Sequence, residues 1–395
     1  MQLVRQVQIK ASEILDKITF LSKNLYNAAT YTVRQRFFKD RHWIRYNELY
    51  NVLKTHDAYQ KLKTTCGSHP PQQFLKQVDS NFKGFFNSLK EWKKNPAKFQ
   101  GIPKLPYYKR KNGQNVVYFT SLQCRLKEGF VLLTEKMEKL RFPRIKTDLK
   151  SVKGVRIVPF GDRYNVELIY DYESRDLHLN DINALGIDLG INNIVTASDN
   201  MGNKPLIIKG GVIKSINQFY NKQLSKYKSM AKKCNKMEMT NRIKKLHRKR
   251  NNKVKDFFHK TSRKVVNYCI SNNIGSIIIG YNERWKQEIN IGKKNNQNFV
   301  SVPFLKLVQQ IEYKSEMVGI IVIRTSEEYT SQMCSSCGVI RKANRKYRGL
   351  YVCKDCGMVL NADVNASINI LQKEIPKSRW IGDRGCLNRP LVLKI

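Results

Sequence analysis

Acidic residues are scarce in this chain of 395 residues. It contains 31 Asp plus Glu against 73 Lys plus Arg, which gives a formal net charge of +42. Charge of one sign at this density repels itself and opposes compaction of the chain. Because a bound polyanion relieves that repulsion, the composition favours a nucleic-acid partner. A soluble protein with a basic surface, such as a ribosome-associated factor, is the simpler alternative.

Long apolar stretches are also absent from the sequence. No run approaches the roughly 20 apolar residues that cross a bilayer, and the N-terminal stretch MQLVRQVQIKASEILDK has no apolar signal core. Five of the nine cysteines, an odd number, are scattered along the chain, which fits a reducing compartment better than a disulfide framework. We therefore expect a cytoplasmic, nucleoid-associated prokaryotic protein with no membrane partner.

The other four cysteines have the spacing of a metal site. Two residues separate Cys334 from Cys337 and Cys353 from Cys356, and fifteen residues lie between the two pairs. Four thiolates arranged in two such pairs bind Zn²⁺ tetrahedrally. Because this ligand set leaves no open coordination position, the sequence predicts one structural Zn²⁺ ion.

Residues 1–180 show two patterns of apolar residues, one typical of strands and one typical of helices. Residues 2–10 alternate weakly between apolar and polar, as in a strand. From residue 11 to residue 100, apolar residues recur at three- and four-residue steps, and many aromatic residues stand beside Lys or Arg. Short apolar runs divided by Gly, Asn and Asp fill residues 101–180. These patterns predict a small β-barrel, formed by residues 1–10 and 101–180, with a helical domain inserted between its strands.

After residue 181, predicted strands and helices alternate. Three strands with tight turns come first, and the final helix of the pattern follows the cysteines. This order of elements is that of the RNase H-like fold and predicts a multidomain α+β protein. The predicted strands are 185–189, 194–198, 206–208, 276–279 and 320–323, and the predicted helices include 304–318 and 364–371.

A strongly basic helical stretch lies within this second half. Between residues 222 and 264 there are 17 Lys plus Arg and only two acids, Glu238 and Asp256. Apolar residues persist there at helical spacing, which predicts two helices with a buried seam that includes Met237 and Ile243. The outer face is a solvated surface or, as its sign and density favour, a track for nucleic acid.

Two aspartates stand out from their surroundings. Asp188 interrupts an apolar strand, where a core strand would not normally place a charge. Gly186 and Gly190 flank it at two residues' distance, and we expect them to leave room for a ligand. Asp363 precedes the last helix, where it is either a metal ligand or the helix N-cap. Clustered carboxylates hold the two divalent ions that cleave phosphodiesters, so both aspartates are candidates for that task.

The chain resembles TnpB, the RNA-guided nuclease of insertion sequences, and the related compact type V CRISPR effectors. This resemblance implies a β-barrel wedge domain with a helical recognition insertion, then a RuvC-type RNase H-like nuclease domain with an inserted four-cysteine zinc ribbon. It also implies a guide RNA from the transposon end, a double-stranded DNA target and two catalytic Mg²⁺ ions. The matching segments are GIDLGINNIVTASDN, YTSQMCSSCG, YVCKDCG and NADVNASINIL and, more loosely, KNLYNAATY, FKGFFNSLK and KLPYYKRKNG.

The third catalytic acid departs from the family pattern. The family usually has a Glu directly after the strand at 276–279, where this chain has Gly280. Either the nuclease is inactive and the protein is a guided DNA-binding repressor, or a neighbouring strand supplies the carboxylate. Glu327 and Glu328 follow the adjacent predicted strand, and relatives with a relocated Glu resemble this segment. We favour Glu327 over Glu328, and place Glu283 third because it lies past the strand end.

By this resemblance, Asp188 and Asp363 match the first and last RuvC aspartates, and with Glu327 they are the expected catalytic Mg²⁺ ligands. The nuclease domain is then 181–331 with 360–380, interrupted by a zinc ribbon for target-strand loading at 332–359 and followed by a tail at 381–395. We expect a monomeric, Mg²⁺-dependent endonuclease that cleaves guide-complementary DNA beside a short flanking motif. The short chain favours a transposon protein over a CRISPR effector.

Overall fold

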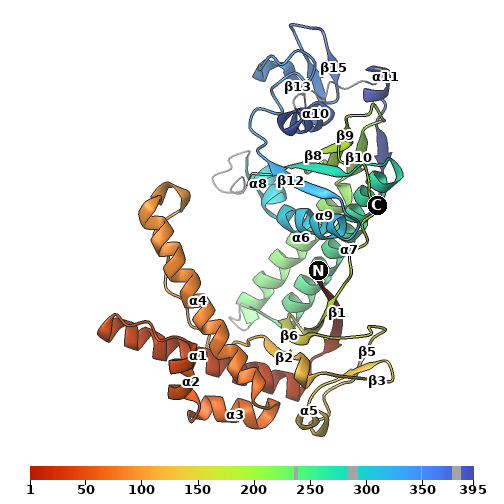
Figure 1. The fold of residues 1–395 in the computed structure, drawn as a ribbon. Coiled ribbons are helices and arrows are strands. Elements are labelled where there is room, and N and C mark those ends of the chain that lie inside the picture. The colour runs from red at the N-terminus through yellow and green to blue at the C-terminus, as the bar shows by residue number, and fades with distance from the viewer. Residues whose placement is uncertain (235–238, 283–291, 348, 376–383) are drawn as a thin grey trace. The chain divides into compact units, whose positions relative to one another are not determined.

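The protein divides into two compact units, Met1–Tyr172 and Glu173–Ile395. The computed structural model describes the chain except for residues 235–238, 283–291, 348 and 376–383 (Figure 1). Within the described parts, none of the helices combines the length and the apolar character that a membrane span requires. The division after Tyr172 comes shortly before the boundary predicted at residue 180.

A four-stranded antiparallel sheet forms the base of the first unit, with the strand order β1-β7-β6-β2. The first strand pairs along its whole length with β7, from Gln2 opposite Asp171 to Lys10 opposite Arg163. Because β1 and β2 lie in one sheet, the helices between them in the chain are an insertion between strands. The four strands are β1 (Gln2–Lys10), β2 (Val117–Thr120), β6 (Gly154–Phe160) and β7 (Arg163–Asp171).

A second sheet of the first unit has the order β3-β4-β5 and is hydrogen-bonded separately. The expected closure of these strands into one barrel therefore stays a prediction. Its elements, with the neighbouring short helices, are η1 (Pro96–Lys98), η2 (Ser121–Gln123), β3 (Arg125–Lys127), β4 (Phe130–Leu132), α5 (Glu135–Lys139) and β5 (Ile145–Lys146).

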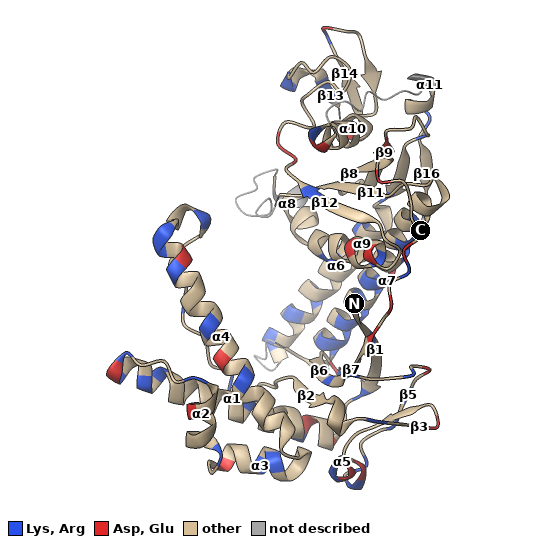
Figure 2. Cartoon of the chain, viewed as in Figure 1, with Lys and Arg blue, Asp and Glu red and all other residues tan. Residues whose placement is uncertain are grey.

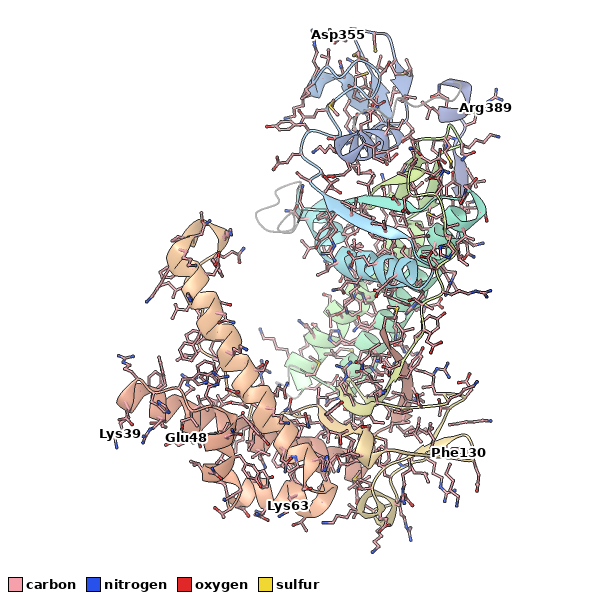
Figure 3. All side chains as sticks on the ribbon, in the orientation of Figure 1. Lys39, Glu48, Lys63, Phe130, Asp355 and Arg389 are labelled. Atoms are coloured by element: carbon pink, nitrogen blue, oxygen red, sulfur yellow. The ribbon has the colours of Figure 1, made fainter. Side chains whose placement is uncertain are left out.

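Four helices form the insertion, which confirms the predicted helical region. Their apolar stripes meet in one core, in which Leu25 and Phe82 are buried. Pro70 and Pro71 stand in the first turn of α4, where the missing N–H of proline costs nothing. Lys39 and Lys63 extend from the surface of these helices (Figure 3). The helices are α1 (Glu13–Asp40), α2 (Tyr46–Leu53), α3 (Asp57–Cys66) and α4 (His69–Lys94).

A six-stranded mixed sheet is the centre of the second unit, in the order β12-β11-β8-β9-β10-β16. The predicted three-stranded meander is confirmed as the antiparallel run β8-β9-β10. Strand β11 runs parallel to both β8 and β12. An unpredicted edge strand, β16, lies in the segment expected to be a tail. The strands are β8 (Ala184–Asp188), β9 (Asn193–Asp199), β10 (Leu206–Lys209), β11 (Ser276–Gly280), β12 (Ile321–Thr325) and β16 (Leu391–Leu393).

Helices cover both faces of this sheet. Leu185 and Ile187 of β8 pack with apolar residues of α7 and α9, whereas Ala184 packs with Ile370 of α10 on the other face. Because side chains alternate along a strand, residues 184, 186 and 188 all face α10 (Figure 1). The helices are α6 (Gly211–Cys234), α7 (Asn241–Ser271), α8 (Lys293–Val300), α9 (Phe304–Glu316), α10 (Ala362–Glu374) and α11 (Arg384–Leu387).

The predicted basic helices are α6 and α7, and Lys and Arg recur along both of them (Figure 2). Ile243 and Phe257 of α7 are buried, as expected for the seam. The seam residue Met237 lies outside the described residues.

Gly186 has a different role from the one expected. A Cβ atom built on Gly186 would lie 2.4 Å from the backbone oxygen of Ser367 and 2.7 Å from the Cβ of Leu371, both in α10. A Cβ on Gly190 would lie 2.7 Å from the backbone oxygen of Asn193. The expectation that these glycines leave room for a ligand is therefore wrong, because the protein's own backbone occupies the space.

The segment between β12 and α10 forms a small three-stranded sheet in the order β13-β14-β15. Its core consists of Tyr351, Cys334, Cys353 and Ala362. The apolar core is small, so the fold of this ribbon needs a further source of stability. The elements are η3 (Lys342–Asn344), β13 (Arg345–Tyr347), β14 (Leu350–Val352) and β15 (Val359–Leu360).

The contact at Gly186 predicts a sharp difference between two Gly→Ala substitutions in the second unit. Gly186→Ala is expected to lower the free energy of unfolding by about 1–3 kcal/mol, because the new methyl group overpacks the contact with α10. Gly211→Ala, where a Cβ meets nothing within 4 Å, should leave stability unchanged or raise it. Calorimetric unfolding of the two variants tests this, and equal unfolding temperatures would contradict it.

Candidate active site

Three separate elements of the second unit contribute the predicted carboxylates. Asp188 is the last residue of β8. Glu327 is the second residue after β12, and Asp363 is the second residue of α10. The structure brings them together, because Asp188 interacts electrostatically with both Asp363 and Glu327. Glu283, the third candidate for the last carboxylate, lies outside the described residues.

The carboxyl group of Asp188 resists ionisation. Burial is the main cause, since water no longer solvates the anion, and the negative charge of Asp363 adds to it. The guanidinium of Arg345 opposes both effects, and the net result raises the pKa of Asp188 to about 7. A cation bound nearby would stabilise the ionised form of this carboxyl group.

Glu327 is the more strongly affected of the two adjacent glutamates. Burial and the charge of Asp188 raise the pKa of Glu327 to about 9, against the opposing charge of Lys373. Its Oε1 is buried and has no hydrogen-bond partner among the described residues. Glu328, by contrast, is exposed. The structure therefore places Glu327, not Glu328, at the carboxylate cluster.

Gly280 explains how Glu327 reaches the cluster. Gly280 is opposite Thr325 in the parallel pairing of β11 with β12, so Glu327 lies just beyond it on the neighbouring strand. A Cβ on Gly280 would lie 2.8 Å from Glu327 Cγ, 3.1 Å from Glu327 Oε1 and 2.5 Å from Ile370 Cδ1. The Glu327 side chain thus occupies the space into which a side chain at position 280 would extend.

Asp363 is not the N-cap of α10, so that alternative is wrong. The cap is Asn361, whose Oδ1 accepts hydrogen bonds from the backbone N–H groups of Asp363 (2.9 Å) and Val364 (3.3 Å). The Asp363 carboxylate instead accepts a hydrogen bond from Asn193 Nδ2 at 2.8 Å and pairs with Arg345 Nη2 at 3.2 Å. Position 363 is therefore free of a capping role and faces the cluster.

Sequence reasoning missed two residues of this site, Asn193 and Arg345. Asn193 begins β9 and is buried, and its Oδ1 accepts a hydrogen bond from Lys209 Nζ at 3.1 Å. Arg345 begins β13 of the ribbon and is one of 73 basic residues, so nothing in its sequence context distinguishes it. An amide at the start of a buried strand, as in Asn193, is a weak signal that could have been noticed.

The acidic cluster suits a hard divalent cation. Mg²⁺ prefers carboxylate oxygens and water as ligands, and three clustered carboxyl groups repel one another when ionised. The unpartnered Oε1 of Glu327 is a buried acceptor that a cation would satisfy. The donor set and this orphaned oxygen therefore fit Mg²⁺, with Asp188, Glu327 and Asp363 as ligands.

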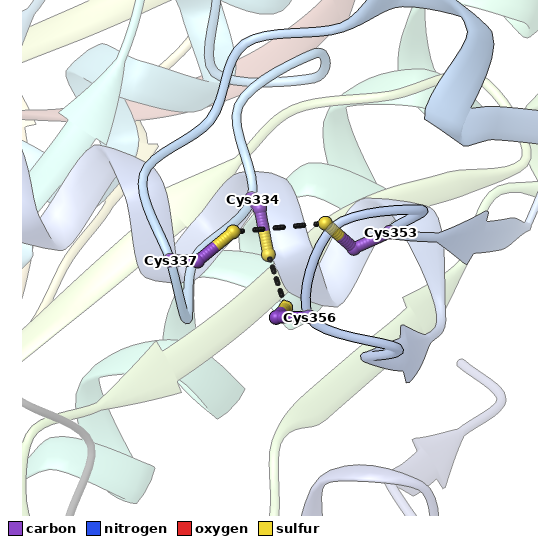
Figure 4. A group of neighbouring side chains, drawn as sticks. All are labelled: Cys334, Cys337, Cys353 and Cys356. Atoms are coloured by element: carbon purple, nitrogen blue, oxygen red, sulfur yellow. Dashed lines mark hydrogen bonds between the residues drawn. The ribbon is translucent and has the colours of Figure 1, made fainter.

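The four predicted cysteines form a separate and tighter cluster (Figure 4). Their Sγ atoms all lie within 4.8 Å of one another, and no other such group of three or more Cys, His, Asp or Glu is found in the described residues. The Sγ atoms of Cys334 and Cys356 are 3.6 Å apart, as are those of Cys337 and Cys353. This cluster could bind zinc, which would supply the stability that the small ribbon core lacks.

A first prediction for the site concerns pH. A carboxyl group whose pKa is raised by folding holds a proton that the unfolded chain has lost, so its contribution to stability falls as pH rises towards the folded-state pKa. Glu327→Gln removes this effect and should therefore gain stability relative to wild type between about pH 5 and pH 9, by up to about 1.4 kcal/mol per pH unit.

Calorimetric unfolding temperatures at several pH values, without added Mg²⁺, provide the measurement. The matched control is Glu328→Gln, one residue away and exposed, which should follow wild type throughout. A difference between Glu327→Gln and wild type that does not change with pH would contradict the burial of an ionisable Glu327.

A second prediction concerns the cysteines. The purified protein should contain one Zn²⁺ per chain, and Cys353→Ser should lose it together with the cooperative unfolding of the ribbon, because folding of such modules requires the metal. Cys269→Ser, which alters a buried cysteine of α7 outside the cluster, is the control. Elemental analysis of both variants checks this, and full zinc content in Cys353→Ser would count against the site.

Two family models match the chain. The OrfB_IS605 model, described as "Probable transposase", matches residues 168–286, and the model of the Cas12f1-like TNB domain matches residues 304–370. The CRISPR-associated endodeoxyribonuclease Cas12f1 of Sulfoacidibacillus thermotolerans is 26% identical over 420 residues, which cover 95% of this chain and 93% of that protein. TnpB-like protein ORF457 of Acidianus two-tailed virus is 22% identical over 406 residues, covering 91% and 83%.

A solved structure extends the likeness to the fold. The structure of the mini-RNA-guided endonuclease CRISPR-Cas_phi3 aligns with a TM-score of 0.50 at 12% identity, over 97% of this chain and 94% of that one. At this identity the match concerns the fold alone. The family models and relatives confirm the resemblance carried by the cysteine and aspartate motifs: the chain is similar to TnpB-like proteins and to the compact Cas12f proteins.

Proposed function

We propose that this protein is an RNA-guided DNA endonuclease that hydrolyses phosphodiester bonds at Asp188, Glu327 and Asp363. The main support is the meeting of these three acids from β8, the end of β12 and the start of α10, with Asp188 coupled to both of the others. A half-buried cluster of like charges, as these acids form, tends to destabilise a protein and is typical of binding or catalytic sites. The similarity to Cas12f1 agrees with this proposal, since that protein is named as an endodeoxyribonuclease.

The domain scheme follows from the same proposal. In this scheme, the sheet of the second unit belongs to an RNase H-like domain of the RuvC type at 181–331 and 360–380, and residues 332–359 are its inserted zinc ribbon. In the first unit, the sheets are the wedge domain and the helices of residues 11–100 are the recognition domain. The order of strands and insertions supports each assignment.

The acids are proposed to hold two Mg²⁺ ions. When bound, such ions activate the attacking water and stabilise the leaving oxygen. The residues around them fix the geometry: Asn193, supported by Lys209, orients one oxygen of Asp363, and Arg345 pairs with the other. The guanidinium of Arg345 is also a strong phosphate ligand, so a DNA phosphate entering the site can replace Asp363 as its partner.

Nucleic-acid partners follow from charge and aromatic surface. The basic helices α6 and α7 present a cationic face suited to a phosphate backbone (Figure 2). In the first unit, the Arg34 guanidinium lies 5.0 Å from the ring centroid of the exposed Tyr108, a pairing that suits contact with both phosphates and bases. Base pairing with the guide would read the target, and the protein would read a short flanking motif.

The guide is proposed to be an RNA from the transposon end, and the site of action the nucleoid of a prokaryotic cell. The monomeric state is part of the proposal. Two competing outcomes are a CRISPR effector with the same chemistry and a guided DNA-binding repressor without cleavage. The presence of a half-buried acidic cluster favours the cutting enzyme over the repressor.

Cleavage of a plasmid tests the proposed chemistry. With guide RNA and Mg²⁺, the wild-type protein should cut a plasmid that carries the guide-complementary sequence beside a randomised flanking region. Asp188→Asn and Asp363→Asn should each lower the rate by more than about 100-fold, because each removes a metal ligand, while target binding persists. Glu327→Gln should lower it comparably, and its neighbour Glu328→Gln should not.

Each alternative has its own result in this assay. Target binding by wild type without cleavage would support the repressor. Full cleavage by Asp188→Asn would show that the acids are wrongly assigned, and equal rates for the two Glu→Gln variants would reject Glu327 as the third ligand. Sequencing the copurified RNA identifies the source of the guide, and the absence of any such RNA would favour an unguided protein.

A further inference from the structure

One face of α10 is lined with polar side chains that hold a neighbouring stretch of backbone. Asn365, Asn369 and Lys373 recur at intervals of four residues, so they lie above one another on the same face of the helix. All three donate hydrogen bonds to carbonyl groups of residues 326–333. This stretch contains Glu327 and leads from β12 into the ribbon.

The backbone N–H of Glu327 donates to Asn282 Oδ1 at 3.1 Å, and among the contacts from α10 those nearest Glu327 come from Lys373 and Asn369. The ammonium group of Lys373 donates to the carbonyl oxygens of Ser326 and Glu328, both at 2.8 Å, which are the residues on either side of Glu327. Asn369 Nδ2 donates to the carbonyl oxygens of Thr330 at 2.8 Å and Met333 at 2.7 Å. The amide of Asn369 is completely buried; its Nδ2 makes these two hydrogen bonds, whereas its Oδ1 has no partner among the described residues.

The stretch around Glu327 has little regular structure of its own. It lies beyond the last paired residue of β12, Thr325, so no strand ladder fixes it. Tyr329 has a φ of 63°, a left-handed conformation that is uncommon outside glycine. The hydrogen bonds within this stretch join residues that are close in sequence. For example, Thr330 Oγ1 donates to the carbonyl oxygen of Glu327 at 2.8 Å. Its conformation must therefore be set by contacts from elsewhere.

A glutamate at position 280 would not need such support. Gly280 is the last residue of β11, which is paired on both sides by β8 and β12, and it is opposite Thr325 in that ladder. A side chain there would be positioned by the sheet itself. Glu327 lies past the end of an edge strand, so moving the carboxylate from strand to loop removes this source of rigidity.

We propose that Lys373 and Asn369 of α10 are positioning residues that hold the Glu327 carboxylate at the catalytic metal site, in place of the strand ladder. This inference deepens the proposed function and rests on it. Because α10 also begins with Asp363, one rigid helix fixes two of the three carboxylates relative to each other.

Divalent-ion binding to the full-length protein is the test, with Mn²⁺ as the probe followed by electron paramagnetic resonance. Lys373→Met keeps the aliphatic stem but removes the donors, and Lys373 is exposed, so the variant should fold. It is expected to weaken Mn²⁺ binding about 10- to 100-fold, as loss of a group that orients a ligand typically does. Lys373→Arg, which keeps donors and charge, should restore most of the affinity.

Matched controls separate positioning from general damage. Lys306→Met makes the same change at an exposed lysine of α9 and should bind Mn²⁺ like wild type. Asn365→Leu removes the contacts to Met333 and Ser335, farther along the chain from Glu327, and should affect zinc content more than Mn²⁺ affinity. Asn369→Leu should instead weaken Mn²⁺ binding, and the Lys373 variants decide the matter if Asn369→Leu fails to fold.

The inference and the proposed function can fail separately. If Asp188→Asn abolishes Mn²⁺ binding but Lys373→Met leaves the affinity and the Mg²⁺ requirement for cleavage unchanged, the positioning role is overturned and the metal site stands. If Asp188→Asn also leaves Mn²⁺ binding unchanged, the metal site itself is overturned, and this inference with it. Faster amide exchange across residues 326–330 in Lys373→Met would support the role independently of metal, and unchanged exchange would oppose it.

Discussion

The close contact between α10 and β8 is the constraint on which the second unit depends. Without a side chain at Gly186, the backbone of α10 comes within 2.4 Å of where a Cβ would be. That approach brings the start of the helix, with Asp363, over the end of the strand, with Asp188. It also places the buried hydroxyls of Ser198 and Ser367 2.7 Å apart, a hydrogen bond that fixes the helix along β9. A helix held in this way can position catalytic groups at its start and along its side.

The cost of this arrangement is electrostatic. Burial and the charge of a neighbouring carboxyl group raise the pKa of both Asp188 and Glu327, so both side chains favour their neutral forms. Arg345 and Lys373 offset part of this cost from two sides, one from the ribbon and one from the end of α10. Neither cation contacts all three acids. The site therefore retains a net preference for an added cation, which is the physical basis for assigning metal binding to it.

Much of the second unit could be predicted, because the sequence patterns that indicate its elements lie within short segments. Short apolar runs divided by turns indicated the strands, two Cys-x-x-Cys pairs indicated the ribbon, and Asp188 was conspicuous as a charge within an apolar strand. Arg345, Asn193 and the polar face of α10 could not be predicted, because each acquires its role only from residues that are distant in sequence. Gly186 was misinterpreted for the same reason: its neighbour is a helix about 180 residues later in the chain, and sequence spacing does not reveal such an approach.

The pairing of β11 with β12 makes the absence of the usual glutamate understandable. In a parallel ladder, Gly280 and Thr325 are neighbours, and a residue two positions beyond Thr325 has its side chain on the same face of the sheet. A carboxylate can therefore reach the same space from either strand, but not from both. With a Cβ at position 280, which would lie 2.8 Å from Cγ and 3.1 Å from Oε1 of Glu327, the Glu327 side chain would have to move. The absence of a side chain at position 280 and the position of the Glu327 side chain therefore depend on each other. The strand that loses the carboxylate must also lose its side chain, and the loop that gains the carboxylate must gain support from α10.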